Sequence, residues 1–205
     1  MSAHCCAPAK PAIDPRFRKA LWIALVVNAL MFVVELVSSA GTGSVSLLAD
    51  SIDFFGDAAN YAVSLAVLGM AASIRSRASI LKAACMAAFG IFVLARAAWV
   101  AATGAVPEPL AMGAVGLLAL VANVAVALLL YRHRGGDANA RSAWICSRND
   151  AVGNIAVMLA ALGVFGTGSA WPDLAVAALM AVLAVAGAAT VLRHASGELR
   201  AARAG

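Results

Sequence analysis

Long apolar stretches alternate with short polar breaks along the whole chain. Each stretch is long enough to cross a membrane as a helix, which takes about 20 residues, and far longer than the short alternating segments of a membrane barrel. Breaks such as Gly41-Thr42-Gly43 and Pro107-Glu108-Pro109 separate them. The pattern predicts an all-α bundle of six membrane-spanning helices. The predicted spans are 17–40, 44–72, 80–103, 108–131, 143–165 and 172–192.

Composition supports a membrane protein. Hydrophobic residues make up 63% of the 205 positions and charged residues only 12%, whereas soluble domains carry about 25% charged residues. The first apolar stretch is too long for a signal-peptide core, and no small-residue cleavage site follows it. We therefore expect a multi-pass protein of a bacterial cytoplasmic membrane. The expected organisation is a tail at 1–16, a six-span domain at 17–193 and a short tail at 194–205.

The basic residues predict how the spans are oriented. Of the 15 Lys and Arg residues, all except Arg96 and Arg148 flank the spans, and a six-span arrangement places them on one side. The opposite loops carry only the acids Glu108 and Asp173. Because basic residues collect on the cytoplasmic side, both termini are predicted to be cytoplasmic. A basic rim at the lipid surface also explains the net charge of +5 without a nucleic-acid partner.

Two pairs of polar residues lie inside predicted spans at helical spacing. Asp53 and Asp57 in the second span, and Cys146 and Asp150 in the fifth, are each four residues apart. Each pair therefore lies on one face of its helix. Ionised carboxylates are costly inside a bilayer and usually belong to ion pathways. Three carboxylates and one thiolate match the ligand number of a tetrahedral zinc site, so these four residues are the candidate metal site.

Weaker candidate ligands border this set. Asp50 lies near the stripe of Asp53 but closer to the outer surface, where it could serve as a gate. Asn154 continues the face of Asp150 by one turn, and could supply an oxygen ligand or a hydrogen bond between helices.

The N-terminal tail carries a second metal-like feature, His4-Cys5-Cys6. These side chains could capture a soft metal ion and pass it on, or they could be incidental residues of a disordered tail. The four cysteines make no disulfide framework, because two face a reducing cytoplasm and two lie in spans.

Other polar residues inside the spans have structural explanations. Arg148 is predicted to pair with an acid such as Glu35 of the first span, or to reach back toward the cytoplasmic interface. Interhelical hydrogen bonds or ion pairs can satisfy Glu35, Arg96 and Asn123. A membrane scaffold held together by such pairs is an alternative function, although the acids inside the spans outnumber the two arginines there.

The second and fifth spans together carry a recognisable pattern. Residues 43–51 read Gly-Ser-Val-Ser-Leu-Leu-Ala-Asp-Ser and precede Asp53-x-x-x-Asp57, while Cys146-x-x-x-Asp150 follows in the fifth span. This pattern resembles the cation diffusion facilitator (cation efflux) family. The resemblance implies a metal exporter whose site is formed by Asp53, Asp57, Cys146 and Asp150. It also implies a homodimer, which we expect to form through transmembrane helices because the chain leaves no room for the usual cytoplasmic domain of that family.

Ligand chemistry orders the candidate substrates. Carboxylates alone would admit Mg²⁺, Mn²⁺ or Ca²⁺, whereas a thiolate shifts the preference toward Zn²⁺ and Cd²⁺. Zinc is the first choice as transported substrate, followed by cadmium and then by cobalt or iron(II). The sequence has no phosphate-binding glycine-rich loop and no nucleophile–base pair, so we expect neither an enzyme nor a prosthetic group.

Exchange with protons follows from the same residues. Metal binding requires deprotonated ligands, and like charges in a medium of low dielectric favour protonation of the empty site. Export of metal in exchange for protons is therefore expected. A proton-only pathway or an organic-cation transporter is a further alternative, and the low aromatic content of 6% weakens the organic cation.

Overall fold

The computed structural model describes residues 15–66, 72–132 and 138–204. Within these helices, the side chains of 72–79, 82, 138–146, 148–149 and 194–204 lie outside the description. The described residues form six α-helices and no strand, which confirms the predicted all-α class. The helices are α1 (Pro15–Thr42), α2 (Val45–Ala66), α3 (Ala72–Thr103), α4 (Pro109–Tyr131), α5 (Ala138–Thr167) and α6 (Trp171–Ala204).

Five of the six helices contain an apolar segment long enough to cross a membrane. The exception is α2, whose 22 residues suffice for a crossing but include three aspartates. Large apolar side chains such as Val37, Leu110 and Phe165 are exposed around the bundle. A water-soluble monomer rarely exposes so much apolar surface, whereas lipid accommodates it. The chain is an integral membrane protein.

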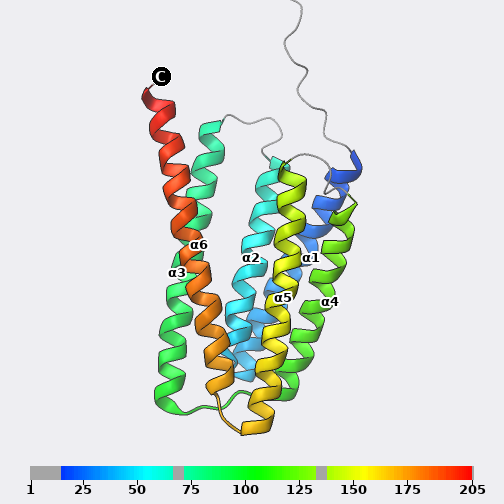
Figure 1. The fold of residues 1–205 in the computed structure, drawn as a ribbon, viewed down its shortest axis with the longest axis vertical. Coiled ribbons are helices and arrows are strands. Elements are labelled where there is room, and N and C mark those ends of the chain that lie inside the picture. The colour runs from blue at the N-terminus through cyan, green and yellow to red at the C-terminus, as the bar shows by residue number, and fades with distance from the viewer. Residues whose placement is uncertain (1–14, 67–71, 133–137, 205) are drawn as a thin grey trace, which may run out of the picture.

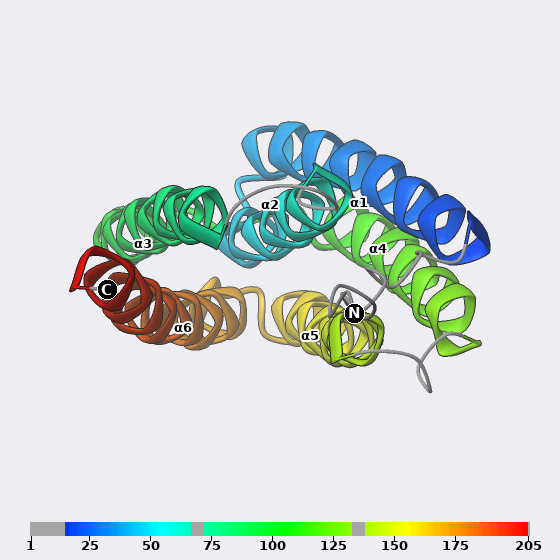
Figure 2. The same cartoon turned by 90° about the horizontal axis from the view of Figure 1, so that it is seen from above.

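The two helices that carry the candidate acids, α2 and α5, lie at the centre of the bundle. Seen from above, α3 and α6 pair at one end and α1 and α4 lie at the other, with α2 and α5 between them (Figure 2). α1 packs closely on α2, and α4 packs closely on α5. The central position of α2 and α5 allows their polar side chains to face other helices instead of lipid.

Glycine ends α1, α3 and α5 at the same side of the bundle, opposite the N-terminus (Figure 1). Gly43, Gly104 and Gly168 have φ angles of 75°, 69° and 61°, a left-handed conformation that glycine adopts without strain. The N–H of each donates to the carbonyl oxygen four residues earlier, at 2.9, 2.9 and 2.8 Å. These bonds satisfy carbonyl groups that would otherwise be left open at the helix ends.

Small residues bring neighbouring helices close together. A Cβ on Gly90 of α3 would lie 2.7 Å from Cγ2 of Val185 in α6, and one on Gly116 of α4 would lie 3.3 Å from Cγ of Met158 in α5. Close approach of this kind stabilises helix pairs in lipid, where the hydrophobic effect between helices is weak. The pairs α3/α6 and α4/α5 are therefore tightly packed on either side of α2.

Candidate metal site

The acids of α2 and α5 lie next to one another in the middle of the bundle. The carboxyls of Asp57 and Asp150 are within hydrogen-bonding reach of each other, and Asp53 interacts electrostatically with Asp57. Asp57 is buried, at 6% exposure, while Asp53 and Asp150 are half-buried. Oδ2 of Asp150 has no hydrogen-bond partner among the side chains that the structure describes. The structure thus brings together the three carboxylates of the predicted site.

Asp53 and Asp150 also line a cavity of about 420 Å³ that is bounded by α2, α3, α5 and α6. Met86 of α3 and Met180 of α6 line the same cavity, and thioether sulfur is a soft metal ligand. Sδ of Met86 lies 3.4 Å from the position that a Cβ on Gly56 would occupy, so this sulfur is beside α2 at the level of the acids. Sequence reasoning missed both methionines, because methionine in an apolar helix normally fills the core.

A buried tyrosine of α2 lies one turn beyond Asp57, toward the end of the bundle where α1 begins. The Tyr61 hydroxyl donates to Oδ2 of Asp57 at 3.0 Å and lies 2.8 Å from Oγ of Ser147 in α5. Both Tyr61 and Ser147 are buried. Partners of this kind fix the orientation of a ligating carboxylate. Tyr61 was not predicted, although its spacing of four residues from Asp57 was a signal for it.

The remaining predicted ligands lie partly or wholly outside the described residues. Cys146 occupies α5 one turn before Asp150, as predicted, but its side chain is not described. His4, Cys5 and Cys6 fall outside the described ranges altogether. Among the described side chains, no three His, Cys, Asp or Glu residues converge closely enough to hold a metal ion as they stand. The three carboxylates are therefore neighbours that would have to turn toward one another to bind a shared ion.

Asp50 and Asn154, the weaker candidates on α2 and α5, bond to each other. Nδ2 of Asn154 donates to Oδ2 of Asp50 at 2.5 Å, and Oδ1 of Asn154 accepts from Nδ2 of Asn123 in α4 at 2.9 Å. The interhelical hydrogen bond predicted for Asn123 is confirmed. Neither Asp50 nor Asn154 lines the cavity. Glu35 lies against Asp50, and its predicted pairing with Arg148 rests on a side chain that is not described.

Asp173, which the sequence placed in an outer loop, is buried and binds the start of α2. Its carboxylate accepts hydrogen bonds from Oγ of Ser44 at 2.7 Å, from N of Val45 at 2.8 Å and from N of Ser46 at 3.1 Å. Ser44 in turn accepts from N of Leu47 at 3.1 Å. The first turn of α6 thereby caps the N-terminus of α2, where a negative charge is favourable. Sequence spacing gave no signal for a contact between residues so far apart.

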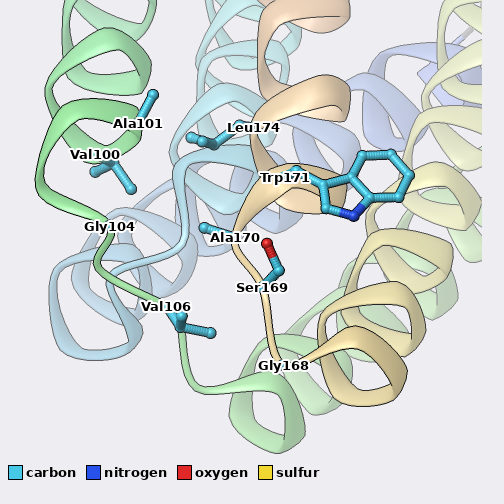
Figure 3. Close-up of a pocket in the computed structure, with 9 residues that line it drawn as sticks. All are labelled: Val100, Ala101, Gly104, Val106, Gly168, Ser169, Ala170, Trp171 and Leu174. Atoms are coloured by element: carbon cyan, nitrogen blue, oxygen red, sulfur yellow. The ribbon is translucent and has the colours of Figure 1, made fainter.

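A second cavity, of about 410 Å³, lies at the outer end of the bundle where the α3–α4 and α5–α6 connections meet (Figure 3). Its lining carries no charged side chain, and it is therefore not a candidate metal site. Trp171 is largely exposed beside it, in the position that suits tryptophan at a membrane interface. The lining residues are Val100, Ala101, Gly104, Val106, Gly168, Ser169, Ala170, Trp171 and Leu174.

A multi-pass helical membrane protein with acids buried between its two central helices has the features of an ion transporter. The family model of the cation efflux transmembrane domain matches residues 21–199. The chain belongs to the cation efflux family, and the predicted resemblance is confirmed. Members of this family transport divalent cations and are not enzymes. A search of the curated proteins found no match.

Proposed function

We propose that this protein exports Zn²⁺, and Cd²⁺ as a second substrate, from the cytoplasm in exchange for protons. Asp53, Asp57, Cys146 and Asp150 bind the ion. The observation that carries the proposal is the meeting of Asp57 of α2 with Asp150 of α5, next to a cavity that Asp53 also lines. Acids of α2 and α5 therefore lie together beside a cavity that an ion can enter and leave.

The charge balance around the acids favours a cation over a protein partner. No described basic side chain is among the groups that act electrostatically on Asp53 or Asp150. The scaffold alternative depends on Arg96 and Arg148. Arg96 is exposed on α3 and does not neutralise the buried acids, while the side chain of Arg148 lies outside the description. Neighbouring carboxylates repel one another unless they bind protons or a metal ion. When protons replace the metal ion on these carboxylates, metal release is coupled to proton uptake.

Sulfur near the carboxylates supports Zn²⁺ and Cd²⁺ over harder ions. Cys146 supplies a thiolate in this proposal, and the thioethers of Met86 and Met180 border the same cavity. Soft sulfur ligands favour zinc and cadmium over Mg²⁺ and Ca²⁺. Cobalt and iron(II) are the substrates to test next.

Transport by purified protein in liposomes tests the proposal. Zn²⁺ flux is measured under an imposed pH gradient for the wild type and for Asp57→Asn and Asp150→Asn, which keep side-chain volume but remove a charge. Glu108→Gln is the matched control, because Glu108 is an exposed acid at the start of α4. We expect flux to fall to background in both site variants and to stay unchanged in the control.

Three results would contradict the proposal in different ways. Zn²⁺ flux that survives both site variants would place the ion pathway elsewhere. A folded wild type that moves none of Zn²⁺, Cd²⁺, Co²⁺ and Fe²⁺ would favour the scaffold. Zn²⁺ flux that does not depend on the pH gradient would be consistent with the proposed metal site but would contradict the proposed exchange with protons.

A further inference from the structure

The most unusual buried group outside the cavity is Glu35 of α1. Its side chain is 0% exposed, and neither carboxylate oxygen has a hydrogen-bond partner among the described residues. A buried carboxylate without a donor or a cation is strongly destabilising. Because this one lies within a membrane-spanning helix, either a proton or a metal ion must balance its charge.

Glu35 belongs to a cluster of polar side chains from four helices. Its carboxyl is within hydrogen-bonding reach of Asp50 in α2, which is 1% exposed. Asp50 is joined to Asn154 of α5, and Asn154 to Asn123 of α4, by the hydrogen bonds described above. Oδ1 of Asn123 is buried and has no hydrogen-bond partner within the described part of the chain. The cluster is rich in acceptor oxygens. Its described residues come from α1, α2, α4 and α5, whereas α3 and α6 pair at one end of the bundle (Figure 2).

The number of acceptor oxygens without a hydrogen-bond donor indicates whether a metal ion or a proton balances this cluster. Among the described side chains, both oxygens of Glu35 and Oδ1 of Asn123 lack a donor, and the charged groups that act on Glu35 are the acids Asp50 and Asp53. One proton shared by Glu35 and Asp50 would serve only one pair of oxygens. A divalent metal ion contacts several oxygens at once, at about 2.0–2.6 Å. The surplus of acceptors therefore fits a metal ion better.

We propose that Glu35 and Asp50 form a second cation-binding position, which takes a hard divalent cation such as Mn²⁺ or Mg²⁺. An amide oxygen of Asn123 completes the oxygen ligands, and Asn154 holds Asp50 in place. The position lies about one turn nearer the outer end of α2 than Asp53, and it contains no sulfur. Its chemistry differs from that of the cavity-side site, where a thiolate is expected. Equilibrium binding here does not depend on the proposed export activity.

Equilibrium Mn²⁺ binding, measured by electron paramagnetic resonance on the full chain in lipid nanodiscs, tests this position. His4→Ala, Cys5→Ser and Cys6→Ser remove the tail as a competitor, and Asp150→Asn disables the cavity-side site. We expect this background to bind Mn²⁺ still. Adding Glu35→Gln should weaken the binding by about tenfold or more, as expected when a supporting or direct ligand is lost.

Two further variants make the outcome decisive. Asp50→Asn should weaken Mn²⁺ binding as Glu35→Gln does, and Glu108→Gln should leave it unchanged, with each variant checked for a monodisperse elution profile. The proposal is overturned if the background binds no Mn²⁺, because protons then balance the cluster. It is equally overturned if Glu35→Gln leaves binding intact while Asp50→Asn abolishes it, because Asp50 then serves the cavity-side site.

Discussion

Replacement of the buried Asp173 by alanine should strongly destabilise this protein. The carboxylate is 0% exposed and accepts three hydrogen bonds from the start of α2, at 2.7, 2.8 and 3.1 Å. Asp173→Ala would leave the N–H groups of Val45 and Ser46 buried without an acceptor. It would also remove a negative charge from a helix N-terminus that favours one.

The size of the effect can be worked from these bonds. A hydrogen bond to a charged group contributes about 1.5–3 kcal/mol, and each buried donor left open costs about 1–3 kcal/mol. Because the three bonds share one carboxylate and are not additive, we expect a loss of about 4 kcal/mol in the free energy of unfolding. For a chain of this length that corresponds to a fall of about 8–16 °C in apparent Tm. Asp173→Asn keeps one acceptor oxygen and should lose roughly half as much.

Thermal unfolding of the purified protein, followed by the loss of the monodisperse fraction in detergent, measures this effect. Glu108→Ala is the matched control, since Glu108 caps α4 on the same side through N of Leu110 and N of Ala111 but is exposed. An exposed cap of this kind contributes about 1 kcal/mol. If Asp173→Ala lowers the apparent Tm no more than Glu108→Ala does, the inference from burial and bond number is wrong.

Three further predictions concern the site and the packing around it. Tyr61→Phe should lower Zn²⁺ affinity about tenfold while the fold is kept, since the hydroxyl orients Asp57; an unchanged affinity in a Zn²⁺ titration would show that the hydrogen bond is only structural. Met86→Leu combined with Met180→Leu should lower Cd²⁺ flux relative to Zn²⁺ flux in a competition assay, because soft sulfur favours cadmium, and equal flux ratios would argue against thioether contact. Gly90→Leu should destabilise the α3/α6 pair by about 1–3 kcal/mol through a clash with Val185, whereas Gly41→Ala, which meets no atom within 4 Å, should change the apparent Tm little.

Helix number and outer helix ends could be predicted because the sequence marks them directly. The predicted break at Gly41-Thr42-Gly43 is where α1 ends, and the third span was predicted to end at Thr103, as α3 does. Two helices extend well beyond the predicted spans: α3 begins at Ala72 instead of 80, and α6 runs to Ala204 instead of 192. By contrast, α2 ends at Ala66, before the predicted end at 72. Hydropathy reports the thickness of the lipid, not the length of the helix, so it carries no signal for helical turns that continue into water.

The candidate site was predictable only as far as spacing along single helices allows. The spacing of four residues placed Asp57 and Asp150 on the right faces, and the structure brings their carboxyls together. Rotation of α2 relative to its neighbours decides that Asp53 reaches the cavity while Asp50 bonds to Asn154. That rotation depends on packing against several helices at once, which one sequence does not reveal. Ligation by Cys146, the homodimer and the bacterial membrane stay predictions.

The hydrogen bonds of α2 also determine from which neighbouring helices, and at which end, α2 is hard to separate. α2 is tied to α5 at two levels, through Asp50 with Asn154 and through Tyr61 with Ser147. Its outer end is tied to α6 by the three bonds of Asp173. Separation of α6 from α2 at the outer side must break all three of these bonds to one buried carboxylate. A motion that opens the cavity of Asp53 and Asp150 at the opposite end of the bundle, where α1 begins, can keep these three bonds.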